Sequence, residues 1–169
     1  MSRPVCVLVG PPGAGKTTVG LLVAAALGVD FRDTDADIVA AAGKSIPDIF
    51  FDDGEPVFRT FERAAVSVAL DSFGGVLALG SGAILADATR QRLHGHTVVY
   101  LNVELSDAAA RVGMSGGGRP LLALNPRATL KFLLEQRRPL YQEVATITVT
   151  TDGRTPEDVA DDVLAAVKR

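Results

Sequence analysis

The sequence predicts an α/β fold, in which a mainly parallel sheet has helices on both faces. Short apolar, β-rich runs alternate along the chain with segments of helical periodicity. The first run, VCVLVG at 5–10, is apolar at almost every position. A strand without alternation is buried on both faces, which is typical of parallel sheets connected by helices. In such folds the ligand binds beyond the carboxyl ends of the strands.

Composition limits the class of protein. The chain has 169 residues, 47% hydrophobic and 22% charged, which fits one domain over residues 1–169 with a full core. No apolar run approaches the roughly 18 residues of a membrane span, and the first apolar run is too short for a secretory signal. Cys6 is the only cysteine, and we expect a buried thiol. We therefore expect a cytoplasmic monomer without a membrane partner.

Charge is unevenly distributed. The net charge is −3 and there is no tryptophan, so a nucleic-acid partner is not expected. Residues 30–62 contain nine acidic and three basic side chains, whereas residues 111–138 contain six basic and one acidic. This contrast is typical either of two solvated faces or of a site that joins a metal to a phosphate.

The first half of the chain contains three predicted strands. After the strand at 5–10, apolar residues recur at helical spacing, and Gly28 is suited to end that helix. The pattern then predicts a strand at 29–35, helices at 36–43 and 55–72, and a strand at 75–80. The last of these strands runs into Gly80, Ser81 and Gly82. Glycines there indicate either positive φ angles or the close approach of another group.

The second half adds two strands and a long loop. A strand is predicted at 97–103, and Ser106 is placed to cap the helix after it. The glycine-rich segment at 113–126 has few large apolar anchors, so we expect a mobile lid. A helix at 127–143, a strand at 147–151 and a terminal helix opened by Thr155, Pro156 and Asp158 complete the chain.

The strongest motif is GPPGAGKT at 10–17, which matches G-x-x-x-x-G-K-[ST] in full. It lies between a buried strand and a helix, where backbone N–H groups bind phosphate oxygens. Lys16 then reaches the outer phosphates, and the hydroxyl of Thr17 binds Mg²⁺. The remaining expected nucleotide contacts in this segment are Gly13, Ala14, Gly15 and Thr18. The sequence therefore predicts that the protein binds ATP or GTP.

Nucleotide binding leaves three classes open: a small-molecule kinase, a nucleotide-driven switch or motor, and a nucleotide-binding scaffold. The guanine-selecting N-K-x-D is absent from the sequence, and the chain is short for a motor domain. A kinase also requires an acceptor site. Asp33 and Asp35, two residues apart on a predicted strand, point the same way. One carboxylate can hold the water shell of a metal and the other can accept a proton, although both are also candidates for helix caps.

Basic residues supply further candidates. Arg59 and Glu62 are at i and i+3 of a predicted helix, where they form a surface ion pair or Glu62 orients Arg59 toward a carboxylate. Arg119 is on the predicted lid, where it is either a solvated residue or is brought to a transferring phosphoryl group. Arg137 and Arg138 are adjacent candidates for the same pocket.

With these residues in place, the chain resembles the shikimate kinase family from about residue 5 to 165. The matching stretches, in the family's order, are GPPGAGKTT, DTDADI, DIFFDDGEPVFRTFE, LALGSGAI, RPLL and RRPLYQEVA. The resemblance implies a P-loop kinase fold with a five-stranded parallel sheet in the order 2-3-1-4-5. It also implies transfer of the γ-phosphoryl of ATP to the 3-hydroxyl of shikimate, with Mg²⁺, in aromatic amino-acid biosynthesis.

The resemblance implies roles for individual residues around the phosphates. Lys16 looks like the phosphate-binding lysine, Thr17 like the Mg²⁺ ligand and Asp33 like a residue near the metal and its waters. Arg119 looks like the lid arginine that reaches the phosphates. Two further residues, Arg111 and Pro156, fall where the family frames the adenine.

On the acceptor side, the resemblance implies a binding region at about 33–62. Asp35 looks like the aspartate that holds the acceptor hydroxyls and acts as the base, and Arg59 and Arg137 look like the pair that clamps the carboxylate. The family usually has three glycines at 80–82, whose N–H groups help to hold the substrate. Ser81 departs from that pattern and leaves open another cyclic polyol acid. A kinase of a hydroxy acid such as gluconate and a nucleotide-binding protein without transfer activity also stay open.

Overall fold

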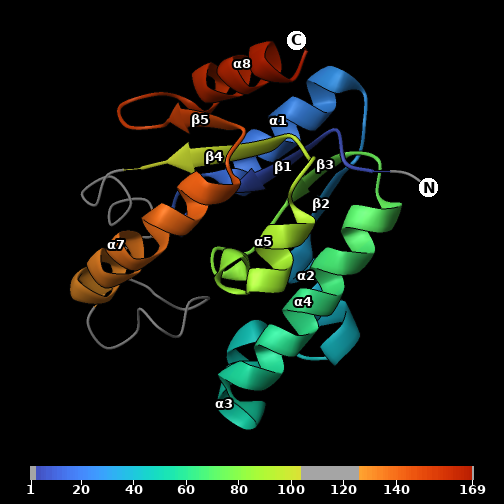
Figure 1. Ribbon diagram of the computed structural model, residues 1–169, viewed down its shortest axis with the longest axis vertical. Helices are drawn as coiled ribbons and strands as arrows, with labels where there is room; N and C mark the ends of the chain where they lie inside the picture. Colours follow the sequence, from blue (N-terminus) through green and yellow to red (C-terminus); the bar gives the residue numbers. More distant parts are fainter. Residues whose placement is uncertain (1–2, 104–125, 169) are drawn as a thin grey trace.

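The computed structural model describes residues 3–103 and 126–168 and contains a parallel sheet of five strands (Figure 1). The strand order is β2-β3-β1-β4-β5, as the family resemblance implies. The strands are β1 (Cys6–Val9), β2 (Phe31–Asp33), β3 (Val76–Ala78), β4 (Val98–Asn102) and β5 (Ile147–Thr150). All neighbours are parallel, so the carboxyl ends of the strands meet at one edge.

Seven helices and one short 3₁₀ turn surround the sheet in the described part of the chain. They are α1 (Lys16–Leu27), α2 (Thr34–Ala42), α3 (Ile46–Asp53), α4 (Glu55–Ser72), η1 (Ala83–Leu85), α5 (Asp87–Arg92), α7 (Pro126–Val144) and α8 (Pro156–Val167). Helices α1 and α8 cover one face, and α4, α5 and α7 lie toward the other (Figure 1). None of the described helices has both the length and the apolar character needed to span a membrane.

The buried strand β1 divides the core into two layers. Cys6 and Leu8 pack with α1 and α8, whereas Val7 and Val9 pack with α4 and α7. All four are completely or almost completely buried, as their uninterrupted apolar pattern predicts. Burial also raises the pKa of the Cys6 thiol to about 11, so this group stays protonated.

The structure corrects the prediction for residues 29–35. Strand β2 ends at Asp33, and Asp35 lies in the first turn of α2. The side chain of Asp33 accepts the N–H of Asp35 at 2.9 Å, so Asp33 is the N-cap that ends the strand and starts the helix. Asp33 and Asp35 therefore do not lie on one face of a strand. The prediction that strand geometry points their carboxylates the same way was wrong.

Helices α3 and α5 were not predicted, although α3 carries a capping signal. The hydroxyl of Ser45 accepts the N–H of Asp48 at 3.2 Å, and Pro47 stands in the first turn. The other boundaries agree closely: α4 spans the predicted 55–72, and Thr155 caps α8 by accepting the N–H of Asp158. The predictions for Ser106 and for 113–125 of the lid lie outside the described residues.

Two leucines provide a matched test of this core. Leu101 on β4 is fully buried, whereas Leu21 on α1 is 53% exposed. We expect Leu101→Ala to lower the free energy of unfolding by about 2–5 kcal/mol, because it removes buried methyl groups and leaves a cavity. Leu21→Ala should change it by less than about 0.5 kcal/mol. Chemical denaturation measures both, and equal losses would contradict the placement of β4 in the centre of the core.

Candidate active site

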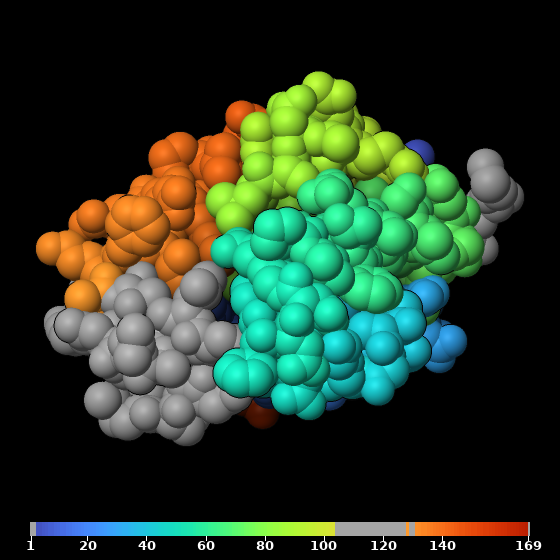
Figure 2. All heavy atoms as spheres, turned by 90° about the horizontal axis from the view of Figure 1, so that it is seen from below, coloured from blue at the N-terminus to red at the C-terminus, as the bar shows by residue number. Residues whose placement is uncertain are grey.

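A cavity of about 740 Å³ lies at the carboxyl edge of the sheet. It is lined by the loop after β1, the β2–α2 junction, α4, the loop after β3, α7 and the start of α8. Figure 2 shows one face of the molecule, on which the atoms of α7 and those of α3 and α4 lie on opposite sides. Of the candidates within the described ranges, all but Arg138 line this cavity, whereas Arg111 and Arg119 lie outside those ranges.

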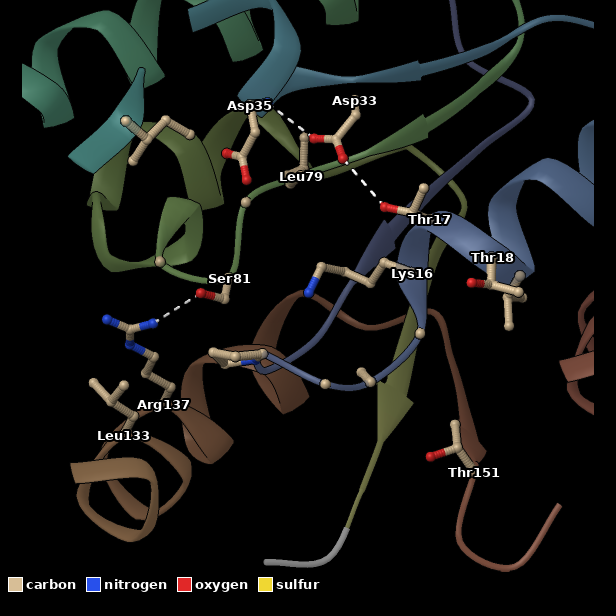
Figure 3. A pocket seen from close by; sticks show the side chains of 18 of the residues that line it. Lys16, Thr17, Thr18, Asp33, Asp35, Leu79, Ser81, Leu133, Arg137 and Thr151 are labelled. Carbon is tan, nitrogen blue, oxygen red and sulfur yellow. Dashed lines mark hydrogen bonds between the residues drawn. The ribbon is translucent and has the colours of Figure 1, made fainter. Parts of the chain in front are cut away.

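The loop after β1 forms one wall. Gly13 and Gly15 have φ angles of 82° and 87°, a left-handed conformation that other residues rarely adopt. The ammonium group of Lys16 donates to the carbonyls of Gly10 at 2.8 Å and Pro11 at 3.1 Å. Figure 3 shows the Lys16 side chain extending from this loop toward Ser81. The loop therefore directs a positive charge and the N-terminus of α1 at the same space, which suits a phosphate group.

Thr17 and Asp33 form a small oxygen cluster beside this loop. The Thr17 hydroxyl donates to the Asp33 carboxylate at 3.4 Å (Figure 3). Hydroxyl and carboxylate oxygens are ligands that Mg²⁺ prefers, and a phosphate-bound Mg²⁺ needs only one or two of them from the protein. Across residues 3–103 and 126–168, no group of three or more acidic, histidine or cysteine side chains is placed to hold a metal. The donor set thus fits an ion shared with nucleotide phosphates.

The loop after β3 forms the opposite wall, and close approach explains its glycines. A Cβ at Gly80 would lie 2.7 Å from Oδ1 of Asp35 and 3.0 Å from Oε2 of Glu62. A Cβ at Gly82 would lie 2.5 Å from Nη1 of Arg59. Both separations are too short for a side chain. Neither glycine has a positive φ angle. Of the two explanations considered from the sequence, positive φ angles therefore do not apply here.

Arg59 and Glu62 form a partly buried pair rather than a surface one. Nη1 of Arg59 lies 2.7 Å from Oε1 of Glu62, which is only 3% exposed, and Glu55 contacts the same guanidinium at 3.2 Å. Burial raises the pKa of the Glu62 carboxyl, and the charge of Arg59 opposes that rise. Glu62 therefore holds Arg59 at the cavity wall.

Arg137, and not Arg138, lines the cavity. Its Nη1 donates to the Ser81 hydroxyl at 3.3 Å (Figure 3). Arg137 is 3% exposed, and its Nε has no hydrogen-bond partner among the described residues. Burial lowers the pKa of its guanidinium. A buried cation with an unused donor is costly unless an anion approaches it. This end of the cavity therefore favours a negatively charged ligand.

Several cavity residues were missed from the sequence. Leu133 on α7, Thr151 after β5, and Arg154 and Val159 near the start of α8 line the cavity beside the predicted Pro156. The side chain of Arg154 bonds to the carbonyl of Thr150 at 3.1 Å and to Asp162 at 2.9 Å. In the sequence, the only indication that Arg154 lines the cavity is its position next to Thr155, the N-cap of α8.

The comparisons with known proteins agree with this geometry. The family model described as shikimate kinase matches residues 12–168 of the chain. The chain belongs to the shikimate kinase family. A shikimate kinase of Salinispora tropica is 67% identical over 162 residues, which are 96% of this chain and 96% of that protein. As a member of this family, the chain is an ATP-dependent kinase, a transferase with the P-loop kinase fold.

Solved structures point the same way. The shikimate kinase from Acinetobacter baumannii, solved in complex with shikimate, superposes with a TM-score of 0.93 at 38% identity, over 99% of this chain and 94% of that one. A gluconokinase from Sinorhizobium meliloti has a TM-score of 0.61 at 21% identity, over 99% and 92% of the two chains. The second likeness shows a shared fold alone, so the shikimate kinase family is favoured over a gluconate kinase.

The close approach at Gly82 predicts a specific local change. In Gly82→Ala the new methyl group meets the end of the flexible Arg59 side chain, so we expect the guanidinium to leave Glu62 while the chain stays folded. The free energy of unfolding should fall by about 3–5 kcal/mol, because the buried Glu62 carboxylate loses its charged partner. Crystal structures of this variant and of Ser81→Ala, in which Arg59 should not move, check the prediction. An Arg59–Glu62 pair unchanged in Gly82→Ala would contradict it.

Proposed function

We propose that this protein transfers the γ-phosphoryl of ATP to the 3-hydroxyl of shikimate, giving shikimate 3-phosphate and ADP. The observation that carries the proposal is the pairing of two walls in one cavity. A phosphate-binding loop with Lys16 faces a wall that contains Arg59, Arg137 and the carboxylate of Asp35. Two guanidinium groups suit a carboxylate, and a carboxylate base suits a hydroxyl. Shikimate, the ligand of the Acinetobacter relative, carries both groups.

On the acceptor side, Arg59 and Arg137 bind the carboxylate of the acid. Glu62 sets the orientation of Arg59, and the Ser81 hydroxyl bonds to Arg137. Within the described part of the chain, the backbone N–H groups of Ser81 and Gly82 have no acceptor, so they are available to the acid or its hydroxyls. Fixed donors of this kind orient a small polar ligand at little entropic cost.

In the transfer step, the 3-hydroxyl oxygen attacks the γ-phosphorus while the bond from that phosphorus to the ADP oxygen breaks. Asp35 accepts the proton of the hydroxyl, and Lys16 stabilises the negative charge on the phosphoryl oxygens. Thr17 and Asp33 are the residues that would hold Mg²⁺, either directly or through its waters. When bound, Mg²⁺ neutralises part of the phosphate charge.

The nucleotide is held by the loop from Gly13 to Thr18, and Pro156 lies against the adenine. Arg111 and Arg119 remain proposed nucleotide contacts, the latter from a lid at about 113–126. The common sheet supports one kinase domain over residues 1–169. One chain supplies both walls of the cavity, which supports a monomer, and the need for ATP supports a cytoplasmic location.

The direct test is ADP release by the purified protein with shikimate, quinate and gluconate compared side by side. We expect turnover with shikimate to exceed that with the other two acids. Faster turnover with gluconate or quinate would overturn the proposed acceptor. ATP binding without ADP release in the presence of any of the acids would overturn transfer itself.

Asp35→Asn tests the proposed base. The amide keeps the shape of the side chain but cannot accept the proton, so kcat should fall by about 10²-fold or more with the fold intact. Asp37→Asn is a control on the same helix, since Asp37 pairs with Arg32 at 2.7 Å outside the cavity and its loss should leave kcat nearly unchanged. Steady-state kinetics measure both variants. Near-normal turnover by folded Asp35→Asn would remove the candidate base.

Arg137→Ala tests the carboxylate clamp. A hydrogen bond to a charged group contributes about 1.5–3 kcal/mol, so KM for shikimate should rise about 10-fold or more. KM for ATP should change far less. Arg138→Ala is the matched control, because the neighbouring arginine does not line the cavity. A larger loss of shikimate affinity in Arg138→Ala than in Arg137→Ala would contradict the assignment.

A further inference from the structure

Three hydrogen bonds hold the peptide groups of Gly80 and Ser81 in the loop after β3. The N–H of Gly80 donates to the hydroxyl of Thr34 at 3.2 Å, and the carbonyl of Gly80 accepts the N–H of Ala83 at 3.1 Å. The next carbonyl, that of Ser81, accepts the hydroxyl of Tyr141. Two of these three bonds come from side chains of distant elements. The loop geometry therefore depends on Thr34 in α2 and Tyr141 in α7.

These bonds fix the direction of the N–H groups that face the acceptor. The structure contains no cis peptide bond among the described residues, so the C=O and N–H of each peptide point in opposite directions. The peptide that carries the Ser81 carbonyl also carries the N–H of Gly82. Because Tyr141 bonds to that carbonyl, the N–H of Gly82 points away from the tyrosine. Gly82 itself lines the cavity.

Tyr141 is well placed to act in this way. It is 1% exposed and its ring stacks on that of Tyr100 with centroids 5.0 Å apart. Burial raises the pKa of the Tyr141 hydroxyl, which therefore remains a donor. Arg137 precedes it by four residues, one turn of α7, and bonds to the hydroxyl of the same Ser81. One helix thus holds both the main chain and the side chain of Ser81.

We propose that Tyr141, together with Thr34, positions the peptide groups of residues 80–82 for binding of the acceptor acid. Neither residue lines the cavity. Thr34 acts through the loop, whereas the Tyr141 hydroxyl acts through the loop and through Arg137, with which it also interacts. This inference rests on the proposed function, because the acid whose binding is measured is shikimate.

Tyr141→Phe is the principal test, with Tyr100→Phe as its matched control. Both variants lose one buried hydroxyl from the same ring stack, but the Tyr100 hydroxyl donates to Asn102 on its own strand at 3.0 Å, whereas that of Tyr141 donates to the loop. We expect Tyr141→Phe to raise both KM and the calorimetric Kd for shikimate about 5–10-fold, with KM for ATP within about 2-fold. Tyr100→Phe should leave all three within about 2-fold. Thermal unfolding is followed for both variants.

Three results would overturn the proposal: an unchanged shikimate KM in Tyr141→Phe, an equal rise in the KM of this variant for ATP, or an equal rise in the shikimate KM of Tyr100→Phe.

Variants of Thr34 supply an independent second experiment. Thr34→Val removes the acceptor for Gly80 and should raise the shikimate KM, whereas Thr34→Ser keeps the hydroxyl and should restore it. If Tyr141→Phe does not fold, the two Thr34 variants test the proposal instead. A normal shikimate KM in Thr34→Val would then refute it.

The wild-type protein in the same assay separates this inference from the proposed function. Absence of shikimate phosphorylation by the wild type would refute the proposed function. Normal wild-type turnover together with a Tyr141→Phe variant of unchanged shikimate affinity would refute the positioning role alone.

Discussion

At the carboxyl end of β3, Gly80 and Gly82 lack side chains, and charged groups from two other elements approach the backbone there. Asp35 comes from α2, and Arg59 and Glu62 come from α4. Buried charges are stable only when opposite charges and hydrogen bonds accompany them. Because no Cβ intervenes, these groups can pack against the loop and against one another. The acceptor wall of the cavity depends on this close approach.

The two walls of the cavity differ in how they are built. The nucleotide wall is formed largely by consecutive residues of one loop, Gly13 to Thr18, so its chemistry is encoded locally. The acceptor wall combines α2, α4, the β3 loop and α7. Its charges are also coupled, since the positive charges of Arg59 and Arg137 both oppose the rise in the pKa of Glu62.

This difference explains how much of the site could be predicted from the sequence. Short β-rich runs that alternate with helical segments predicted the five strands, and the GPPGAGKT motif predicted the phosphate-binding loop. The helical position of Asp35 was missed, because the side chain of Asp33 caps α2 and ends the strand earlier than the apolar pattern suggests. The burial of Glu62 could not be recognised, since an i, i+3 pair with Arg59 has the same sequence on a surface or in a cavity wall. The bond from Tyr141 to Ser81 joins residues 60 positions apart, which no local pattern encodes.

That long separation also affects the order in which parts of the site can form during protein synthesis. During synthesis the phosphate-binding loop, the first three strands and α4 precede α7, which supplies Arg137 and Tyr141. Translation at 5–20 residues per second needs roughly 3–12 s to add the 60 residues between Ser81 and Tyr141. Throughout that interval the Ser81 carbonyl lacks the hydroxyl that holds it in the native state. A nascent chain can therefore acquire its phosphate-binding loop well before it acquires a complete acceptor wall.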